Sequence, residues 1–192
     1  MSRFSNKPKQ RHWLAIQRLI KYVYNTRHHK LQYVAQPIQL LAYSDSSWGG
    51  DHIDRRSVSG IIILLGGAPI IFESRKQSNI ALSTAEAEYV AASETVKQLV
   101  ALENLLAEIG IQTIKPKLFI DNEAAIQQIR GNESTKKSKH IDIKFHYIRN
   151  EFRKGTFNLE YISSKNQLAD LLTKEVSVAT ISTTLERCGF KL

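Results

Sequence analysis

Gln39-Leu-Leu-Ala-Tyr-Ser-Asp45 and Lys117-Leu-Phe-Ile-Asp121 are two short, mostly apolar runs, and each of them ends on an aspartate. Runs of this length and composition, bounded by polar residues, are typical of buried β-strands. A carboxylate that closes such a strand is a poor core residue, because burying an unpaired charge is costly. The two aspartates therefore indicate a chemical site at the ends of two strands.

The segments around these two runs predict an α/β fold. Strands are predicted over residues 38–44, 58–65, 69–74, 117–121 and 157–162, and helices over residues 11–25, 83–109, 122–130, 141–153, 167–174 and 178–187. Tight connections at 48–54 and at Gly66-Gly67 make the first three strands an antiparallel meander. The fourth and fifth strands follow helices, so right-handed crossovers place them parallel to the first. We expect a five-stranded mixed sheet flanked by helices.

Positive charge is concentrated at the start of the chain. The net charge is +9, and residues 1–44 contain eight Lys or Arg residues and no Asp or Glu. A basic arm beside a nearly neutral domain suits a polyanionic partner such as nucleic acid. A solubilising tail or a mitochondrial transit peptide also fits this composition. We expect a basic arm with an amphipathic helix over residues 1–36 and a compact domain over residues 37–192.

The composition also excludes some classes of protein. The chain has a single cysteine, Cys188, so an intrachain disulfide and a multi-cysteine metal site are excluded, and a reducing compartment fits best. The longest apolar stretch, residues 61–72, is interrupted by Gly66-Gly67 and Pro69. It is too short to span a bilayer and is typical of a hairpin. We therefore expect no membrane partner.

Two further acids extend the candidate site. Glu88 lies one turn into the helix predicted over 83–109, and Asp170 lies in the helix predicted over 167–174. In this topology Asp45 and Asp121 end neighbouring strands, and the two helices approach that edge from opposite sides. Several converging carboxylates can hold two Mg²⁺ ions about 3.5–4 Å apart, the arrangement used for phosphodiester chemistry. We expect two Mg²⁺ ions as cofactors, with Mn²⁺ as a substitute.

Each of these acids also has a structural explanation when it is taken alone. Asp45 precedes Ser46-Ser47 and could be a turn residue, whereas Asp121 could cap the next helix. Asp170 could be an exposed carboxylate on a helix. Only the four acids together, in this order, favour a metal site over these readings.

Glu86 competes with Glu88 for the second position in the site. Because they lie two residues apart on one helix, their side chains point to different sides. Glu86 falls three residues after Ser83, where a capping glutamate would accept a hydrogen bond from the Ser83 amide. Glu88 has no such role, so we assign Glu88 to the metal site.

Six short motifs occur in order along the chain. They are Tyr43-Ser-Asp45-x-x-Trp48-x-Gly-Asp51, Arg55-Arg-Ser-Val-Ser-Gly60, Leu82-Ser-Thr-Ala-Glu-Ala-Glu-Tyr89, Asp121-Asn122, Lys139-His-Ile-Asp142 and Gln167-Leu-Ala-Asp-Leu-Leu-Thr-Lys174. Together they resemble the ribonuclease H domain at the carboxyl end of copia-type LTR retrotransposon Pol polyproteins. The resemblance covers residues 38–192, while residues 11–36 resemble the segment that links reverse transcriptase to this domain.

This resemblance implies a ribonuclease H-like fold over residues 37–192. It implies an endoribonuclease that hydrolyses the RNA strand of RNA–DNA hybrids by a two-metal mechanism during reverse transcription. Catalytic and metal-binding roles fall on Asp45, Glu88, Asp121 and Asp170. The implied partners are an RNA–DNA hybrid and the reverse transcriptase domain of the same polyprotein. The implied location is a cytoplasmic virus-like particle or the nucleus.

Substrate contacts are predicted less directly. Ser46, Ser47, Thr84 and Asn122 are candidates for recognising 2′-hydroxyl groups. The basic stretch over 136–154 either follows the phosphate backbone or is a solvated face; its residues are Lys136, Lys137, Lys139, Lys144, Arg149, Arg153 and Lys154.

Many relatives outside the copia type carry a histidine before the last acid, and this chain does not. Here Ser163-Ser164-Lys165 fills that connection. His140 and His146 are weak candidates to replace the missing group, and each also fits a surface or packing role.

Two other functions stay open. One is a catalytically dispensable module that binds hybrid or supports reverse transcriptase, including a host-retained protein derived from an element, which a start at Met1 would fit. The other is a DNA endonuclease of the same wider superfamily.

Overall fold

The computed structural model describes residues 4–35, 38–51, 54–131 and 139–191, with backbone only over residues 139–145. Its centre is a five-stranded sheet of order β4-β3-β2-β5-β6. The strands are β2 (Gln39–Ser47), β3 (Val58–Leu65), β4 (Ala68–Lys76), β5 (Ile114–Ile120) and β6 (Asn158–Tyr161). β2, β3 and β4 pair antiparallel, whereas β5 pairs parallel with both β2 and β6. The predicted mixed sheet is confirmed.

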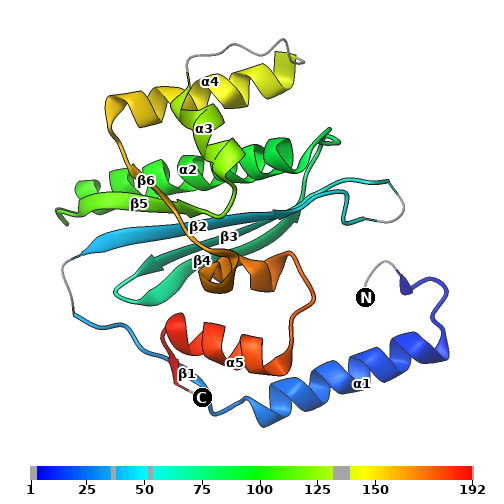
Figure 1. Cartoon of the computed structure of the whole chain (residues 1–192). Helices are drawn as coiled ribbons and strands as arrows, with labels where there is room; N and C mark the ends of the chain where they lie inside the picture. The colour runs from blue at the N-terminus through cyan, green and yellow to red at the C-terminus, as the bar shows by residue number, and fades with distance from the viewer. Residues whose placement is uncertain (1–3, 36–37, 52–53, 132–138, 192) are drawn as a thin grey trace.

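Helices cover both faces of this sheet (Figure 1). On one face lie α2 (Thr84–Glu108), α3 (Glu123–Arg130) and α4 (Lys139–Lys154). On the other face lie two short 3-10 helices, η2 (Ser164–Asn166) and η3 (Leu168–Leu172), and α5 (Val178–Arg187). Alternate side chains of β3 serve the two layers, because successive residues of a strand point to opposite faces. Ile61 and Ile63 pack in the cluster under α2, and Ile62 packs in the cluster with Leu168 and Cys188.

The long helix α2 begins and ends at residues suited to those positions. Ser83 is the N-cap, and its hydroxyl accepts a hydrogen bond from the Glu86 amide at 3.2 Å. Gly110, just past the end, has φ +78°, a left-handed conformation that costs glycine little. These caps fix where the first turn of α2 meets the sheet.

The helix predicted over 167–174 is wrong in type. The segment forms the 3-10 helix η3 instead of an α-helix, with η2 just before it. Gln167 explains the difference. Its backbone is extended (φ −72°, ψ 107°), and its side chain forms hydrogen bonds both within the turn and to β2. Its Oε1 accepts from the Ala169 amide at 3.3 Å, and its Nε2 donates to the Ser44 carbonyl at 3.0 Å. The chain is therefore held against β2 in a tight turn.

The segment that follows the helix predicted over 11–25 contains a short strand. β1 (Lys30–Leu31) pairs antiparallel with β7 (Phe190–Lys191) at the other end of the chain. The amide of Val34 also donates to the Gly66 carbonyl at 2.9 Å. Two-residue strands are too short to show an alternation of polar and apolar residues, so this pairing could not be predicted from the sequence.

The amphipathic helix predicted over 11–25 is observed as α1 (Gln10–Asn25), drawn in blue in Figure 1. Its apolar side chains remain open to solvent: Trp13 is 54% exposed, Ile20 60% and Val23 59%. Among the described residues, no helix is long and apolar enough to cross a membrane.

Candidate metal centre

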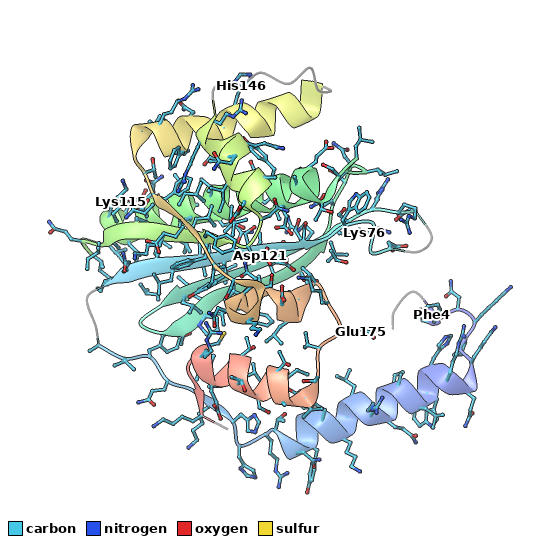
Figure 2. All side chains as sticks on the ribbon, in the orientation of Figure 1. Phe4, Lys76, Lys115, Asp121, His146 and Glu175 are labelled. Atoms are coloured by element: carbon cyan, nitrogen blue, oxygen red, sulfur yellow. The ribbon has the colours of Figure 1, made fainter. Side chains whose placement is uncertain are left out.

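Parallel pairing of β2 with β5 brings two of the predicted acids to one edge of the sheet. The paired stretch ends at Tyr43 and Phe119, so Asp45 lies just beyond it on β2 and Asp121 directly follows β5. β2 continues to Ser47 because it stays paired with β3, so Asp45 lies inside the strand rather than after it as predicted. Carboxylate oxygens of Asp45, Asp121 and Asp170 lie within 4.8 Å of one another. Figure 2 shows Asp121 at this central position.

Gly60 makes the approach of Asp170 possible. It faces Asp45 across the β2–β3 pair. A Cβ atom at Gly60 would lie 2.8 Å from the Ala169 carbonyl oxygen and 2.8 Å from Thr173 Cγ2. Because glycine has no such atom, η3 packs directly on β3. The same close packing carries Asp170 and Thr173 to Asp45.

Glu88 flanks the three aspartates and is poorly satisfied. Its Oε1 accepts a hydrogen bond from the Ser46 amide at 3.0 Å, and the side chain is only 3% exposed. Its Oε2 is buried and has no hydrogen-bond partner among the described residues. Burial, followed by the charges of Asp45 and Asp121, raises the pKa of Glu88 to about 9. A cation near Oε2 would relieve both the missing contact and the repulsion.

Glu86 has the structural role that the sequence indicated, although its bond partner differs. Its Oε2 accepts from the Leu82 amide at 2.9 Å, not from the Ser83 amide as predicted. Ser83 has an extended backbone (φ −149°, ψ 162°), so the Leu82 amide lies within reach of the Glu86 side chain in the first turn of α2. Glu86 therefore closes the first turn of α2, and the carboxylate next to the site is Glu88.

Two residues at the site were not assigned a role from the sequence. The Lys174 ammonium lies 2.8 Å from Asp170 Oδ1 and 3.4 Å from Asp45 Oδ1. The Thr173 hydroxyl donates to the other oxygen of Asp45, Oδ2. The spacing of four between Asp170 and Lys174 is a recognisable pairing signal. Their contacts with Asp45, more than 120 residues away in the chain, are not readable from local sequence.

Opposing effects set the protonation of this group. Burial raises the pKa of Asp170 to about 6, Lys174 acts to lower it, and Asp45 adds a smaller upward contribution. Burial also acts to lower the pKa of Lys174, but the bond to Asp170 and the surrounding carboxylates outweigh it and the pKa is raised. The ammonium offsets only part of the negative charge.

The donor set fits a hard divalent cation. Asp45, Asp121 and Asp170 supply carboxylate oxygens only, the ligands that Mg²⁺ prefers, and neutral sulfur or imidazole donors play no part in this cluster. Glu88, whose Oε2 has no hydrogen-bond partner among the described residues and which is repelled by Asp45 and Asp121, could supply a further oxygen. The four acids predicted from the sequence are therefore gathered at one site, three of them in direct proximity.

Similarity to known proteins agrees with this geometry. The chain is 35% identical over 179 residues to a Retrovirus-related Pol polyprotein from transposon RE2 of Arabidopsis thaliana, a match that covers 92% of this chain and 12% of that protein. The chain belongs to the copia-type Pol polyprotein family. It spans only about an eighth of the length of that first relative. No family model matches the chain.

Two further matches come from proteins of other kinds. Secreted RxLR effector protein 161 of Plasmopara viticola is 38% identical over 103 residues, covering 53% of this chain and 72% of that protein. Among solved structures, LC11-RNase H1 in complex with RNA/DNA hybrid superposes with a TM-score of 0.51. That match has 17% sequence identity and covers 70% of this chain and 93% of the other. The fold is therefore that of ribonuclease H.

In this copia-type chain a serine takes up the connection before the last acid. Ser164 in η2 donates its hydroxyl to Asp121 Oδ2 at 2.8 Å. His146 lies on α4, well away from Asp121 in Figure 2. The side chain of His140 lies outside the described residues.

The residues predicted to recognise 2′-hydroxyl groups lie around this centre. Ser46 is buried, and its hydroxyl has no hydrogen-bond partner among the described residues; Ser47 is half-buried at the end of β2. Thr84 is exposed at the first residue of α2. Asn122 is the N-cap of α3, and its Oδ1 accepts from the Ala125 amide at 3.0 Å. Thr84 and Ser47 are therefore the candidates most open to a ligand.

The predicted basic stretch divides into two parts. Lys136 and Lys137 lie outside the described residues, and Lys139 begins α4, where only the backbone is described. Farther along α4, Arg149 donates through Nε to the Gln128 carbonyl at 2.8 Å, and Lys154 forms an ion pair at 2.8 Å with Glu151. Arg149 thus contributes to packing between α3 and α4.

Proposed function

We propose that this chain is a metal-dependent ribonuclease H that hydrolyses the RNA strand of RNA–DNA hybrids during retrotransposon reverse transcription. The observation that carries the proposal is the convergence of Asp45, Asp121 and Asp170 within 4.8 Å on a ribonuclease H fold, with Glu88 beside them. The similar protein LC11-RNase H1 has been solved with an RNA/DNA hybrid. The copia-type Pol relatives support a role in reverse transcription.

In this proposal Asp45, Glu88, Asp121 and Asp170 hold two Mg²⁺ ions, or Mn²⁺ in their place. Bound ions of this kind activate a water for in-line attack and stabilise the leaving 3′ oxygen. Glu88 retains a proton at neutral pH while the centre lacks a cation, because its pKa is raised to about 9. Loss of that proton supplies a second carboxylate oxygen, so occupation of the centre and deprotonation of Glu88 are coupled.

Selection of RNA would rest on groups near the centre that can contact a 2′-hydroxyl. Ser47 and Thr84 present hydroxyl groups at the end of β2 and the start of α2, on elements that also carry Asp45 and Glu88. Ser46 and Asn122 are less accessible to a ligand, because Ser46 is buried and Asn122 caps a helix. We therefore favour Ser47 and Thr84 as the discriminating contacts.

The arm over residues 1–36 is proposed to contact the reverse transcriptase domain of the same polyprotein, and residues 37–192 to form the nuclease domain. The exposed apolar side chains of α1, among them Trp13 and Leu19, support a protein partner for the arm. A cytoplasmic virus-like particle is the proposed setting. The basic composition of the arm also suits the nucleic acid within such a particle.

The decisive test is cleavage of a labelled RNA–DNA hybrid beside single-stranded RNA and duplex DNA, each with Mg²⁺, with Mn²⁺ and with chelator. We expect the RNA of the hybrid alone to be cut, and only with a divalent ion. Cleavage of duplex DNA would instead favour a DNA endonuclease. Binding of hybrid without cleavage under every metal condition would favour a module without catalysis.

That non-catalytic module is the second candidate function. It is favoured by the similarity to Secreted RxLR effector protein 161, of which the chain covers 72%. The similarity shows that about half of this chain has a counterpart in a protein that is not named as a Pol polyprotein. The same binding and cleavage assay separates the two candidates.

A further inference from the structure

Both oxygens of the most buried acid are already engaged within the protein. Asp45 is 1% exposed, its Oδ2 accepts the Thr173 hydroxyl, and its Oδ1 lies 3.4 Å from the Lys174 ammonium. The same ammonium contacts Asp170 Oδ1 at 2.8 Å. Lys174 therefore links two of the three aspartates whose oxygens form the candidate metal centre.

Lys174 differs from the ordinary surface ion pair. Arg56 and Asp54 lie two residues apart and are 45% and 37% exposed, and such local exposed pairs contribute little to stability. Lys174 joins Asp170, four residues before it, to Asp45 in the middle of the sheet, where an unpaired charge is costly. Its side chain is 42% exposed, so the ammonium can move into solvent on its flexible stem.

We propose that Lys174 is the built-in counter-ion of the metal centre and competes with divalent cations for Asp45 and Asp170. In the metal-free protein its ammonium stabilises the two carboxylates. A divalent ion that ligates both of them displaces the ammonium toward solvent, where it stays close enough to meet a substrate phosphate. Lys174 is thus a positioning residue for the proposed nuclease. The inference rests on that function only in taking these carboxylates as metal ligands.

Competition has two linked consequences. Removing the ammonium leaves repelling carboxylates without a counter-charge, so the metal-free protein loses stability. The same removal abolishes the competitor, so metal binding becomes tighter. A residue with a merely structural role would lower stability without strengthening metal binding. The opposite signs of these two effects separate competition from simple structural support.

The first experiment measures Mn²⁺ binding to the full chain by electron paramagnetic resonance of free Mn²⁺, without nucleic acid. For Lys174→Met we expect an affinity about fivefold or more above that of the wild type, with a lower Tm in chelator. Lys174→Arg keeps the positive charge and should stay near the wild type. Lys76→Met is the matched control, because Lys76 also bridges two aspartates, Asp51 and Asp54, and should leave Mn²⁺ affinity unchanged.

The second experiment uses the wild-type chain and does not depend on the folding of a variant. Reductive dimethylation followed by peptide mass spectrometry reports how accessible each lysine amine is. Addition of Mn²⁺ should accelerate modification of Lys174 and leave Lys76 unchanged. Modification of Lys174 that Mn²⁺ leaves unchanged or slows would overturn the proposal.

The remaining outcomes are also decisive. Unchanged or weaker Mn²⁺ affinity in Lys174→Met, or no Mn²⁺ binding by the wild type, would overturn the counter-ion role. A chain that binds Mn²⁺ and shows the predicted response of Lys174, yet never cleaves hybrid, would contradict the proposed function alone. A chain that cleaves hybrid with an unresponsive Lys174 would contradict this inference alone.

Discussion

Two regions of the molecule place one lysine between two aspartates. Beside the turn that connects β2 and β3, Lys76 Nζ lies 2.6 Å from Asp51 Oδ2 and 2.6 Å from Asp54 Oδ2. At the sheet edge, Lys174 contacts Asp170 and Asp45 at 2.8 and 3.4 Å. The contacts are alike in kind, yet the carboxylates respond in opposite directions. The bond from Lys76 leads the lowering of the Asp54 pKa, whereas burial raises the pKa of Asp170 to about 6.

The difference is one of charge balance and burial. Near the turn, two cations, Lys76 and Arg56, serve the carboxylates of Asp51 and Asp54, and ionisation of Asp54 is favoured. At the sheet edge, one ammonium faces Asp45, Asp121 and Asp170, with Glu88 beside them. An excess of buried negative charge is costly unless a cation completes it. The cluster around Lys76 therefore has a structural role. The cluster around Lys174 has the excess negative charge expected of a site that binds a cation.

Matched substitutions in the two clusters give the largest expected difference. Asp45→Asn should lower hybrid cleavage by at least about a thousandfold, because groups that act as one catalytic unit fail together. Asp51→Asn should retain cleavage within about threefold, since it affects only the turn. Cleavage rates at saturating Mg²⁺, with circular dichroism to verify folding, provide the measurement. Comparable losses in the two variants would remove the distinction between the clusters.

The two glutamates of α2 sharpen the comparison on a single helix. Glu88→Gln should lower cleavage about a hundredfold, while raising Tm in chelator at neutral pH because the amide, unlike Glu88, needs no proton to be buried without charge. Glu86→Gln should do the reverse, with near-normal cleavage and a stability loss of about 1 kcal/mol or less from a weakened helix start. Cleavage rates and urea denaturation of both variants test this crossing pattern. Equal loss of activity in both would contradict the assignment of Glu88.

The sequence predicted the sheet edge better than the residues around it. Asp45 and Asp121 were predicted because an acid that closes an apolar strand stands out in the sequence. The order of the elements then implied that their two strands are parallel neighbours. Asp170 was placed at this edge by the topology and by the family resemblance, but its segment is a 3-10 turn and not the predicted helix. That turn is shaped by Gly60 and Gln167, whose partners lie far away in the chain.

The contacts of Lys174 and Thr173 with Asp45 could not be predicted from the sequence either, because their partner also lies far away in the chain. Both depend on the packing of η3 against β3, and they join residues that are more than 120 positions apart in the chain. Local spacing indicates at most the pairing of Asp170 with Lys174. Helix caps show the converse, since Ser83 and Glu86 act within a few residues and their role was readable.

Excess charge should also make the metal-free protein less stable as pH rises. Burial and neighbouring acids raise the pKa of Glu88 from 4.5 to about 9, so the folded state keeps a proton that the unfolded state loses. That stability is fully present below pH 4.5 and is lost toward pH 9, at up to about 1.4 kcal/mol per pH unit. Asp170 adds a smaller loss between pH 3.8 and about 6.

Urea denaturation in chelator at about pH 5, 7 and 9 measures this slope. Glu88→Gln should flatten it above pH 6, whereas Glu86→Gln should keep it. Added Mg²⁺ should also flatten the slope, because the cation favours the ionised carboxylates. A profile that is flat in wild-type chelated protein would contradict an excess of charge at the sheet edge.

The smallest effect is expected at the cluster around Lys76. Lys76→Met should lower Tm by no more than about 3 °C, because a partly exposed ion pair contributes little and its carboxylates can turn toward solvent. The Tm shift should be the same with and without Mn²⁺, and it should shrink in high salt, which screens the lost pair. For Lys174→Met, by contrast, added Mn²⁺ should restore much of the lost Tm. Thermal unfolding of both variants, with and without Mn²⁺, measures the contrast. A Lys76→Met deficit that Mn²⁺ repaired equally would mean that both lysine bridges stand in for a divalent ion.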